Sequence, residues 1–230
     1  MVRILFIETS TSLCSAALAE DGRIVATRES TGTREHAALT APFLKALLDE
    51  RGLRVKDCSA VCVGRGPGSY TGLRVGVSTA KGLCFGAGIP LLSVGTLETL
   101  CRQAIEEGLL PEGCRHIVPM VDARRMEVYT AVFSADGVAQ SETRPQVIEA
   151  DSFADILDEG PVLFVGDGAA KCAPVLTHPN AHFAEAWPKA GSMLVPALRA
   201  WNEKRFEDIA YFEPSYLKDF IATVSRKKLF

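Results

Sequence analysis

The chain has 230 residues, of which 47% are hydrophobic and 23% charged, so it can bury a full core and is too apolar for a disordered protein. Its formal net charge of −3 gives no overall basic field, which argues against unaided binding to a nucleic-acid backbone. The opening "MVRILFIETS" has one charge and a short apolar run, so we expect neither a signal peptide nor a membrane span. The seven cysteines are scattered through apolar runs, which is typical of packed free thiols in the cytoplasm.

The first half of the chain predicts a mixed sheet covered by helices. Three apolar runs, the second and third joined by the hairpin signal Asp21-Gly22, predict three antiparallel strands. Helical periodicity follows, with Gly52 as its expected C-cap. The later alternation of strands and helices predicts a parallel section of the sheet. The expected elements are strands at 2–8, 13–20, 23–29, 59–64 and 90–94 and helices at 36–51, 71–85 and 97–107.

The second half repeats the opening pattern of the first. The strand ending at Asp122 matches the strand ending at Glu8, and each is followed by a polar turn, a strand and an Asp-Gly pair. Glu8 and Gly22 are 14 residues apart, and Asp122 and Gly137 are 15 apart. This agreement indicates a duplicated unit, although so short a pattern can also recur by chance. Helices near 152–159 and 192–204 and a strand from 161 complete the prediction.

The stretch "VGRGPGSYTGLRVG", residues 63–76, is dense in glycine but contains no lysine, so it is not a P-loop. A dinucleotide fingerprint is also incomplete, because its third glycine position is occupied by Ser69. Ser69 or Thr71 can cap the helix that follows, leaving loop N–H groups to accept an anion. Gly66, Gly68 and Ser69 are therefore the candidate cofactor-binding residues, and a compact structural turn is the equally open alternative.

Two helices carry patterns that indicate an interface. Gly72, Gly76 and Ala80 recur every four residues, and Gly82 and Gly86 extend a parallel row, so another backbone is expected to come close. The earlier helix is apolar on nearly every side, which indicates contact with both its own core and a partner; a wholly internal helix is the alternative. The predicted interface residues are His36, Leu39, Thr40, Phe43, Leu44, Leu47, Gly72, Gly76 and Ala80.

Several phrases resemble the bacterial TsaB (YeaZ) family: "ILFIETSTSLCSAALAEDGRIVA", "GRGPGSYTGLRVGVSTAKGL", "PLLSVGTLETL", "MVDARRMEVYTAVF" and "EPSYLKDF". The resemblance is strong to about residue 133 and thin between about 140 and 210. It implies an α/β fold of two tandem RNase H-like units of the actin-like (sugar kinase/Hsp70/actin) superfamily. We assign these units to residues 1–103 and 104–230 and leave open whether the last helix packs back on the first.

The resemblance also implies a function. Members of the family are non-catalytic partners of the TsaD ligase, in a complex with the TsaE ATPase that forms threonylcarbamoyladenosine in tRNAs reading codons that start with A. The chain would be an essential subunit that forms a heterodimer with TsaD and meets tRNA only through the complex. It would have no cofactor of its own, with ATP or ADP at a complex interface and a homodimer of the isolated chain as open alternatives. Thr96 and Leu100 stand where TsaD has its metal-binding histidines, so we expect neither a metal site nor catalytic residues.

An enzyme acting alone is the alternative, either an actin-like phosphotransferase or a peptidase. The roles of four charged positions also stay open. Glu8 and Asp122 could hold a cation across a cleft or satisfy loop N–H groups. Arg124 and Arg125 could be plain surface charges or contact an anion.

Overall fold

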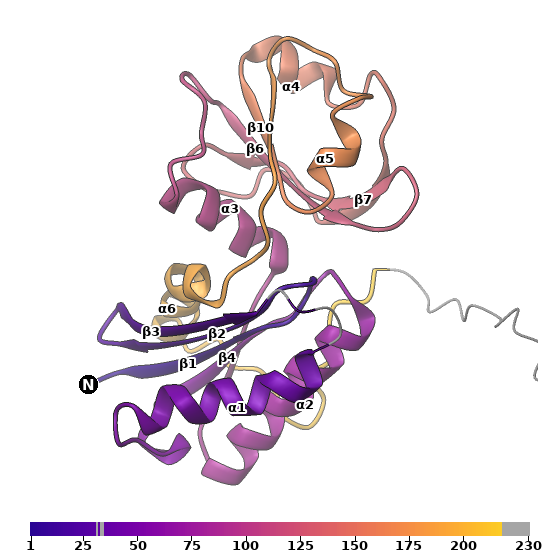
Figure 1. The fold of residues 1–230 in the computed structure, drawn as a ribbon. Helices are drawn as coiled ribbons and strands as arrows, with labels where there is room; N and C mark the ends of the chain where they lie inside the picture. Colours follow the sequence, from indigo (N-terminus) through magenta and orange to yellow (C-terminus); the bar gives the residue numbers. More distant parts are fainter. Residues whose placement is uncertain (31, 33–34, 218–230) are drawn as a thin grey trace, which may run out of the picture.

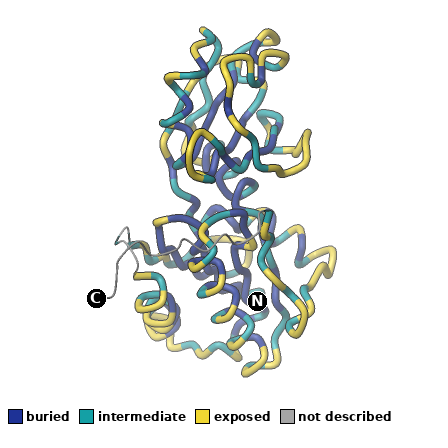
Figure 2. The backbone as a smooth tube through the Cα atoms, turned by 90° about the vertical axis from the view of Figure 1, so that its right-hand side faces the viewer, coloured by how far each residue is buried: buried dark blue, intermediate teal, exposed yellow. Residues whose placement is uncertain are grey.

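The computed structural model describes residues 1–30, 32 and 35–217. The chain forms two lobes, each built on one mixed β-sheet, with the first lobe at the bottom of Figure 1 and the second at the top. Buried residues run through the middle of both lobes and through the junction between them (Figure 2). No helix in the described part of the chain is long and apolar enough to cross a bilayer.

The first sheet has the strand order β3-β2-β1-β4-β5, with β1, β2 and β3 antiparallel and β4 and β5 parallel to β1. Helices α1 and α2 cover one face of it, where Leu5 and Ile7 pack against Leu47 and Val77. These elements are β1 (Arg3–Glu8), β2 (Cys14–Glu20), β3 (Arg23–Ser30), α1 (His36–Asp49), the 3-10 turn η1 (Val55–Asp57), β4 (Ala60–Gly64), α2 (Tyr70–Ala87) and β5 (Leu91–Val94).

The second sheet repeats this topology. Read from β9 to β11, its order is β9-β7-β6-β10-β11, again with three antiparallel strands followed by two parallel ones; β8 adds a short pairing to β6. The duplicated α/β architecture predicted from the sequence is therefore confirmed. The elements are α3 (Thr96–Glu106), β6 (His116–Asp122), β7 (Glu127–Thr130), β8 (Phe133–Ser134), β9 (Arg144–Val147), α4 (Ala154–Glu159), β10 (Val162–Val165), α5 (Ala169–Cys172) and β11 (Ala181–Ala184).

The chain crosses between the lobes more than once. The expected boundary at 103/104 falls inside α3, whose buried residues Leu97, Leu100 and Ala104 pack on the second sheet, so the first sheet ends at β5 and α3 belongs with the second. Near the C-terminus, the 3-10 helix η2 (Ala190–Met193) and α6 (Leu194–Asn202) return to cover the open face of the first sheet. The helix that the sequence analysis left open thus packs back on the first unit.

A C-terminal segment, residues 207–217, then follows the edge of the first lobe. Glu207 forms an isolated β-bridge with Leu91. The Lys81 ammonium of α2 donates to the carbonyl oxygens of Ala210 and Phe212, both at 3.1 Å. The rest of the "EPSYLKDF" phrase beyond residue 217 lies outside the described residues.

Local details differ from the sequence prediction in three places. Helix α1 ends at the C-cap Glu50, and Gly52 follows it with a φ of +63°, so the glycine reverses the chain without being the cap itself. The single helix expected at 192–204 is divided into η2 and α6. Elements α5 and β11 were not predicted, since each spans only four residues, and the strand predicted before Asp136-Gly137 is divided into β7 and β8.

All seven cysteines are free thiols, and six of them are buried, as predicted from their apolar surroundings. Burial raises the pKa of the Cys62 thiol well above its ordinary value, so this thiol stays protonated at neutral pH.

Candidate functional site

The glycine-rich loop between β4 and α2 packs against the turn that follows β1. Ser69 caps α2 through its side-chain oxygen, which accepts a hydrogen bond from the Gly72 N–H at 3.3 Å, and this confirms the predicted cap. The Ser69 N–H itself donates to the Ser10 carbonyl at 2.6 Å. A Cβ at Gly68 would overlap that same carbonyl. This side of the loop is therefore occupied by the chain's own backbone.

The three candidate cofactor residues do not share one cavity. Gly66 lines a pocket of about 450 Å³ between the lobes, and neither Gly68 nor Ser69 is among its lining residues. Two arginines and one glutamate contribute to the same pocket, with Arg199 and Glu98 paired at 3.8 Å across it. Cofactor binding by Gly66, Gly68 and Ser69 stays a prediction.

Glu8 and Asp122 end equivalent strands but stand in different surroundings. Glu8 is fully buried, with Oε1 accepting from the Ser10 N–H at 2.7 Å and Oε2 meeting no hydrogen-bond partner among the described residues. Burial raises the pKa of the Glu8 carboxyl from 4.5 to about 7. Asp122 is exposed and pairs with the Lys171 ammonium. Within the described residues, no group of three or more His, Cys, Asp and Glu side chains could hold a metal ion.

The glycines at the start of α2 face the interior of this chain. A Cβ at Gly72 would overlap the Thr9 carbonyl, and one at Gly76 would overlap the Thr9 hydroxyl. The Thr9 hydroxyl also donates to the Gly72 carbonyl at 2.8 Å. The close backbone approach predicted from this glycine row is real, but the approaching backbone is the turn after β1 and not a partner helix.

Six of the nine predicted interface residues are buried inside the chain. Thr40 donates its hydroxyl hydrogen bond to the His36 carbonyl at 2.6 Å, and Leu44, Leu47 and Ala80 belong to the core beneath α1 and α2. His36, Leu39 and Phe43 are half-buried. Of the nine predicted residues, only these three have side-chain surface that a partner could contact, and for them the interface role stays a prediction.

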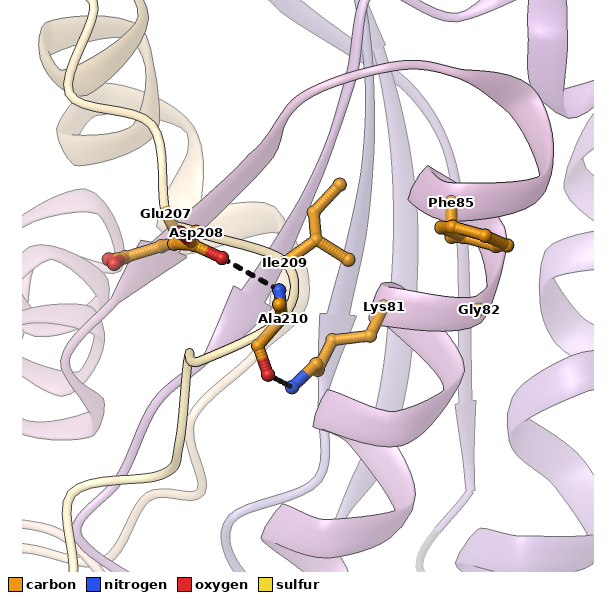
Figure 3. A pocket seen from close by; sticks show the side chains of 7 residues that line it. All are labelled: Lys81, Gly82, Phe85, Glu207, Asp208, Ile209 and Ala210. Atoms are coloured by element: carbon orange, nitrogen blue, oxygen red, sulfur yellow. Dashed lines mark hydrogen bonds between the residues drawn. The ribbon is translucent and has the colours of Figure 1, made fainter.

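The outer face of α2 carries two exposed glycines, Gly82 and Gly86, and an exposed phenylalanine, Phe85. No described atom lies within 4 Å of a Cβ built at Gly82 or Gly86. Phe85, between them, is 83% exposed. It borders a pocket of about 640 Å³ between α2 and the C-terminal segment, with Ile209 and Ala210 on the opposite side (Figure 3). The parallel row of Gly82 and Gly86 in the sequence pointed to this surface.

On the N-terminal half of α1, the exposed positions are small or apolar: Ala37, Ala38, Ala41 and Pro42; further along the helix, Lys45 and Asp49 are exposed and pair with each other. Helices α1 and α2 lie side by side on the same face of the first sheet. We use the name outer helix face for the exposed small and apolar residues of these two helices, Ala38, Ala41, Gly82, Phe85 and Gly86.

Thr96 and Leu100, the two positions at which the resemblance predicted the loss of a metal site, are both fully buried. Leu100 lies in the core of the second lobe. Thr96 begins α3, and its backbone N–H donates to the Gly66 carbonyl at 3.0 Å. In the described structure, Leu100 therefore packs in the core, and Thr96 links the start of α3 to the glycine-rich loop.

Comparison with known proteins agrees with this architecture. Residues 24–225 match the family model described as "TsaD: tRNA N6-adenosine threonylcarbamoyltransferase". The chain is similar to the tRNA threonylcarbamoyladenosine biosynthesis protein TsaB of Escherichia coli, with 31% identity over 96% of each chain. It is also similar to the TsaB protein of Bacillus subtilis, with 33% identity over 71% of this chain and 70% of the relative.

Solved structures give the same result. YeaZ from Pseudomonas aeruginosa superposes with a TM-score of 0.81 at 29% identity, covering 94% of this chain and all of that one. A second structure, described as similar to the peptidase YeaZ from Pseudomonas aeruginosa, has a TM-score of 0.84 at 28% identity and covers 95% of this chain. With its two similar α/β lobes and similarity along nearly its whole length, the chain belongs to the TsaB (YeaZ) family.

Proposed function

We propose that this chain is a non-catalytic partner and scaffold of a TsaD-type threonylcarbamoyltransferase in the formation of tRNA threonylcarbamoyladenosine. Family membership supplies the reaction, because the curated relatives are named for this biosynthesis. The burial of Leu100 in an apolar core supports a role without metal chemistry at that position. The chain would thus contribute surface and shape to the complex.

The outer helix face is the observation that carries the proposal. A glycine in the middle of a helix costs roughly 1 kcal/mol relative to alanine. Gly82 and Gly86 carry this free-energy cost although there is open space where their side chains would be. Phe85, which lies between them in the helix, is 83% exposed. Because Gly82 and Gly86 have no side chains, an apolar helix could pack closely against α2 here, and it would bury Phe85.

The proposed complex has further parts that follow from the family. The TsaE ATPase would join it, and ATP or ADP would bind at a complex interface, for which the pocket at Gly66 is the candidate on this chain. Transfer RNA would bind in the complex, and the isolated chain would form a homodimer through the outer helix face when the ligase is absent. The complex would work in the cytoplasm.

The test is to measure pairing of the purified chain with the TsaD ligase of the same organism by sedimentation. Ala41→Glu places a charge in the contact, and Gly82→Leu fills the space over α2, so each is expected to weaken association by at least about a hundredfold, or about 3 kcal/mol. Val147→Ala is the matched control, since Val147 is also an exposed aliphatic residue (59%) but lies in the second lobe. Thermal melts check that every variant is folded.

The same preparations distinguish the scaffold role from the alternative that the chain is an enzyme acting alone. The isolated chain should hydrolyse ATP and peptides no faster than buffer, and tRNA modification by the ligase should require the chain. Unchanged affinity of both outer-face variants would place the partner on another surface. Turnover by the isolated chain that disappears in the Glu8→Gln variant would overturn the scaffold role itself.

A further inference from the structure

The turn between β6 and β7 holds two successive arginines in an unusual backbone conformation. Arg124 has a φ of +68° and Arg125 a φ of +51°, both in the left-handed region that favours glycine or asparagine. Two neighbouring residues with side chains in this region cost free energy, and glycine at either position would reduce that cost. A function of the two arginine side chains would offset this free-energy cost.

The surrounding residues fix this turn in place. The Arg124 N–H donates to the Asp122 carboxylate at 3.0 Å, and the Glu127 N–H donates to the Arg124 carbonyl at 3.2 Å. From α5, the Lys171 ammonium donates to the carbonyls of Arg125 and Glu127, both at 2.7 Å, and pairs with Asp122. The turn is thus a rigid support for whatever its side chains contact.

Both guanidinium groups are available for an outside ligand. Arg124 and Arg125 are exposed, and neither side chain makes a hydrogen bond or ion pair in the described structure. The Asp122 carboxylate at the start of the turn is already engaged by Lys171 and by the backbone of the turn. Other arginines of this chain do have acidic partners, as Arg3 has Glu20 at 3.0 Å.

The ligand that suits two adjacent free guanidiniums is a phosphate group, which accepts their fork of N–H donors. Both arginines are exposed on the turn, and neither lines the pocket between the lobes or the pocket beside Phe85. An extended backbone with a phosphate at every residue fits such a turn better than an enclosed ligand does.

We propose that Arg124 and Arg125 contact phosphates of the tRNA backbone when the chain is assembled with its ligase. The inference rests on the proposed function and extends it, because it makes the scaffold itself part of the RNA-binding surface. A chain with a net charge of −3 has little general attraction for RNA. Attraction to RNA phosphates must therefore come from local positive charge, such as these two arginines on a fixed turn.

The test uses the complete complex of chain and ligase and measures tRNA affinity between about 50 and 200 mM salt. Each phosphate contact contributes about 0.7 to 0.9 to the slope of log affinity against log salt. The Arg124→Ala/Arg125→Ala double variant should therefore lower the slope by about 1 to 2 and weaken binding about tenfold or more at the lowest salt. The double lysine variant keeps both charges and should retain most of the slope.

Arg23→Ala is the matched control, because Arg23 is exposed in the first lobe and its loss changes the net charge without touching the turn. Sedimentation of the same samples reports pairing with the ligase; if the wild type does not pair, the proposed function fails before RNA is added. If pairing is intact and the double alanine variant keeps the wild-type slope, or if Arg23→Ala has an equal effect, the RNA contact is overturned. Loss of ADP binding by the double alanine variant with unchanged RNA affinity would also overturn it.

Discussion

At the scale of single residues, Glu8 is the most unusual group in the first lobe. It ends the central strand β1, is fully buried, and lies beside Gly64, where a Cβ would overlap its carboxylate. Desolvation raises its pKa from 4.5 to about 7, so the neutral carboxyl is the form that the fold favours. The folded chain therefore binds more protons than the unfolded chain between these two values.

This linkage predicts how stability changes with pH. Because the folded-state pKa is raised, the free energy of unfolding should fall as the pH rises from about 4.5 to about 7. Glu8→Gln keeps the oxygen that accepts from Ser10 and removes the charge, so it should raise the free energy of unfolding at pH 8 by about 3 kcal/mol. Urea unfolding from pH 4 to pH 8 measures both effects.

The control for this experiment is Glu112→Gln, since Glu112 is exposed and should follow the wild-type pH dependence. A Glu8→Gln variant that is less stable than the wild type at pH 8 would show that the ionised carboxylate is the stabilising form. A ligand that supplies a cation to Glu8 would be the first explanation to examine in that case.

At the scale of elements, α2 contains glycines of two kinds. Gly72 and Gly76 face inward and admit the turn after β1. Gly82 and Gly86 face outward with no described atom within 4 Å of an added Cβ. One helix therefore closes the first lobe with its N-terminal half, while its C-terminal half carries the outward-facing residues to which we propose that a partner binds.

Alanine substitutions should separate the two kinds. Gly72→Ala forces its Cβ into the Thr9 carbonyl, so it should lower the free energy of unfolding by about 2 to 3 kcal/mol. Gly82→Ala adds a Cβ in open space and should raise it by up to about 1 kcal/mol, from helix propensity alone. Urea midpoints of the isolated chain test the pair, and equal effects would contradict the packing of α2 described here.

At the scale of the whole molecule, the two lobes are not independent along the chain. The first sheet is covered on one face by η2 and α6, which follow the entire second lobe in sequence. Met193 in η2 is fully buried with Ile4 and Phe6, and the Ala190 N–H donates to the Ser15 hydroxyl at 3.0 Å. The first lobe is therefore complete only when the C-terminal part of the chain has returned to it.

Met193→Asp should consequently unfold the first lobe and not only the C-terminal segment. Burying an unpaired carboxylate among apolar side chains typically costs several kcal/mol. Val195→Asp is the neighbouring control, because Val195 is 40% exposed and should tolerate the charge. Hydrogen exchange at β1 and β4 is the measurement, and continued protection of these strands in Met193→Asp would show that the first lobe folds without η2.

Most strands and helices of the first lobe, and the repetition of its opening pattern in the second, could be predicted because their signals are local. Apolar runs, Asp-Gly turns and helical periodicity lie within short stretches, and the matched positions of Glu8 and Asp122 indicated the duplication. The N-cap of α2 at Ser69 could also be predicted from neighbouring residues. Family membership followed from longer phrases that combine these local features.

Tertiary structure alone decided which surfaces face outward. A sequence row such as Gly72, Gly76 and Ala80 shows that something comes close, but only the position of Thr9 shows that it belongs to the same chain. The burial of Glu8 against the exposure of Asp122, and the return of η2 to the first sheet, likewise depend on residues far apart in sequence. Local propensity fixes the elements, whereas the side of each element that remains free is set by long-range packing.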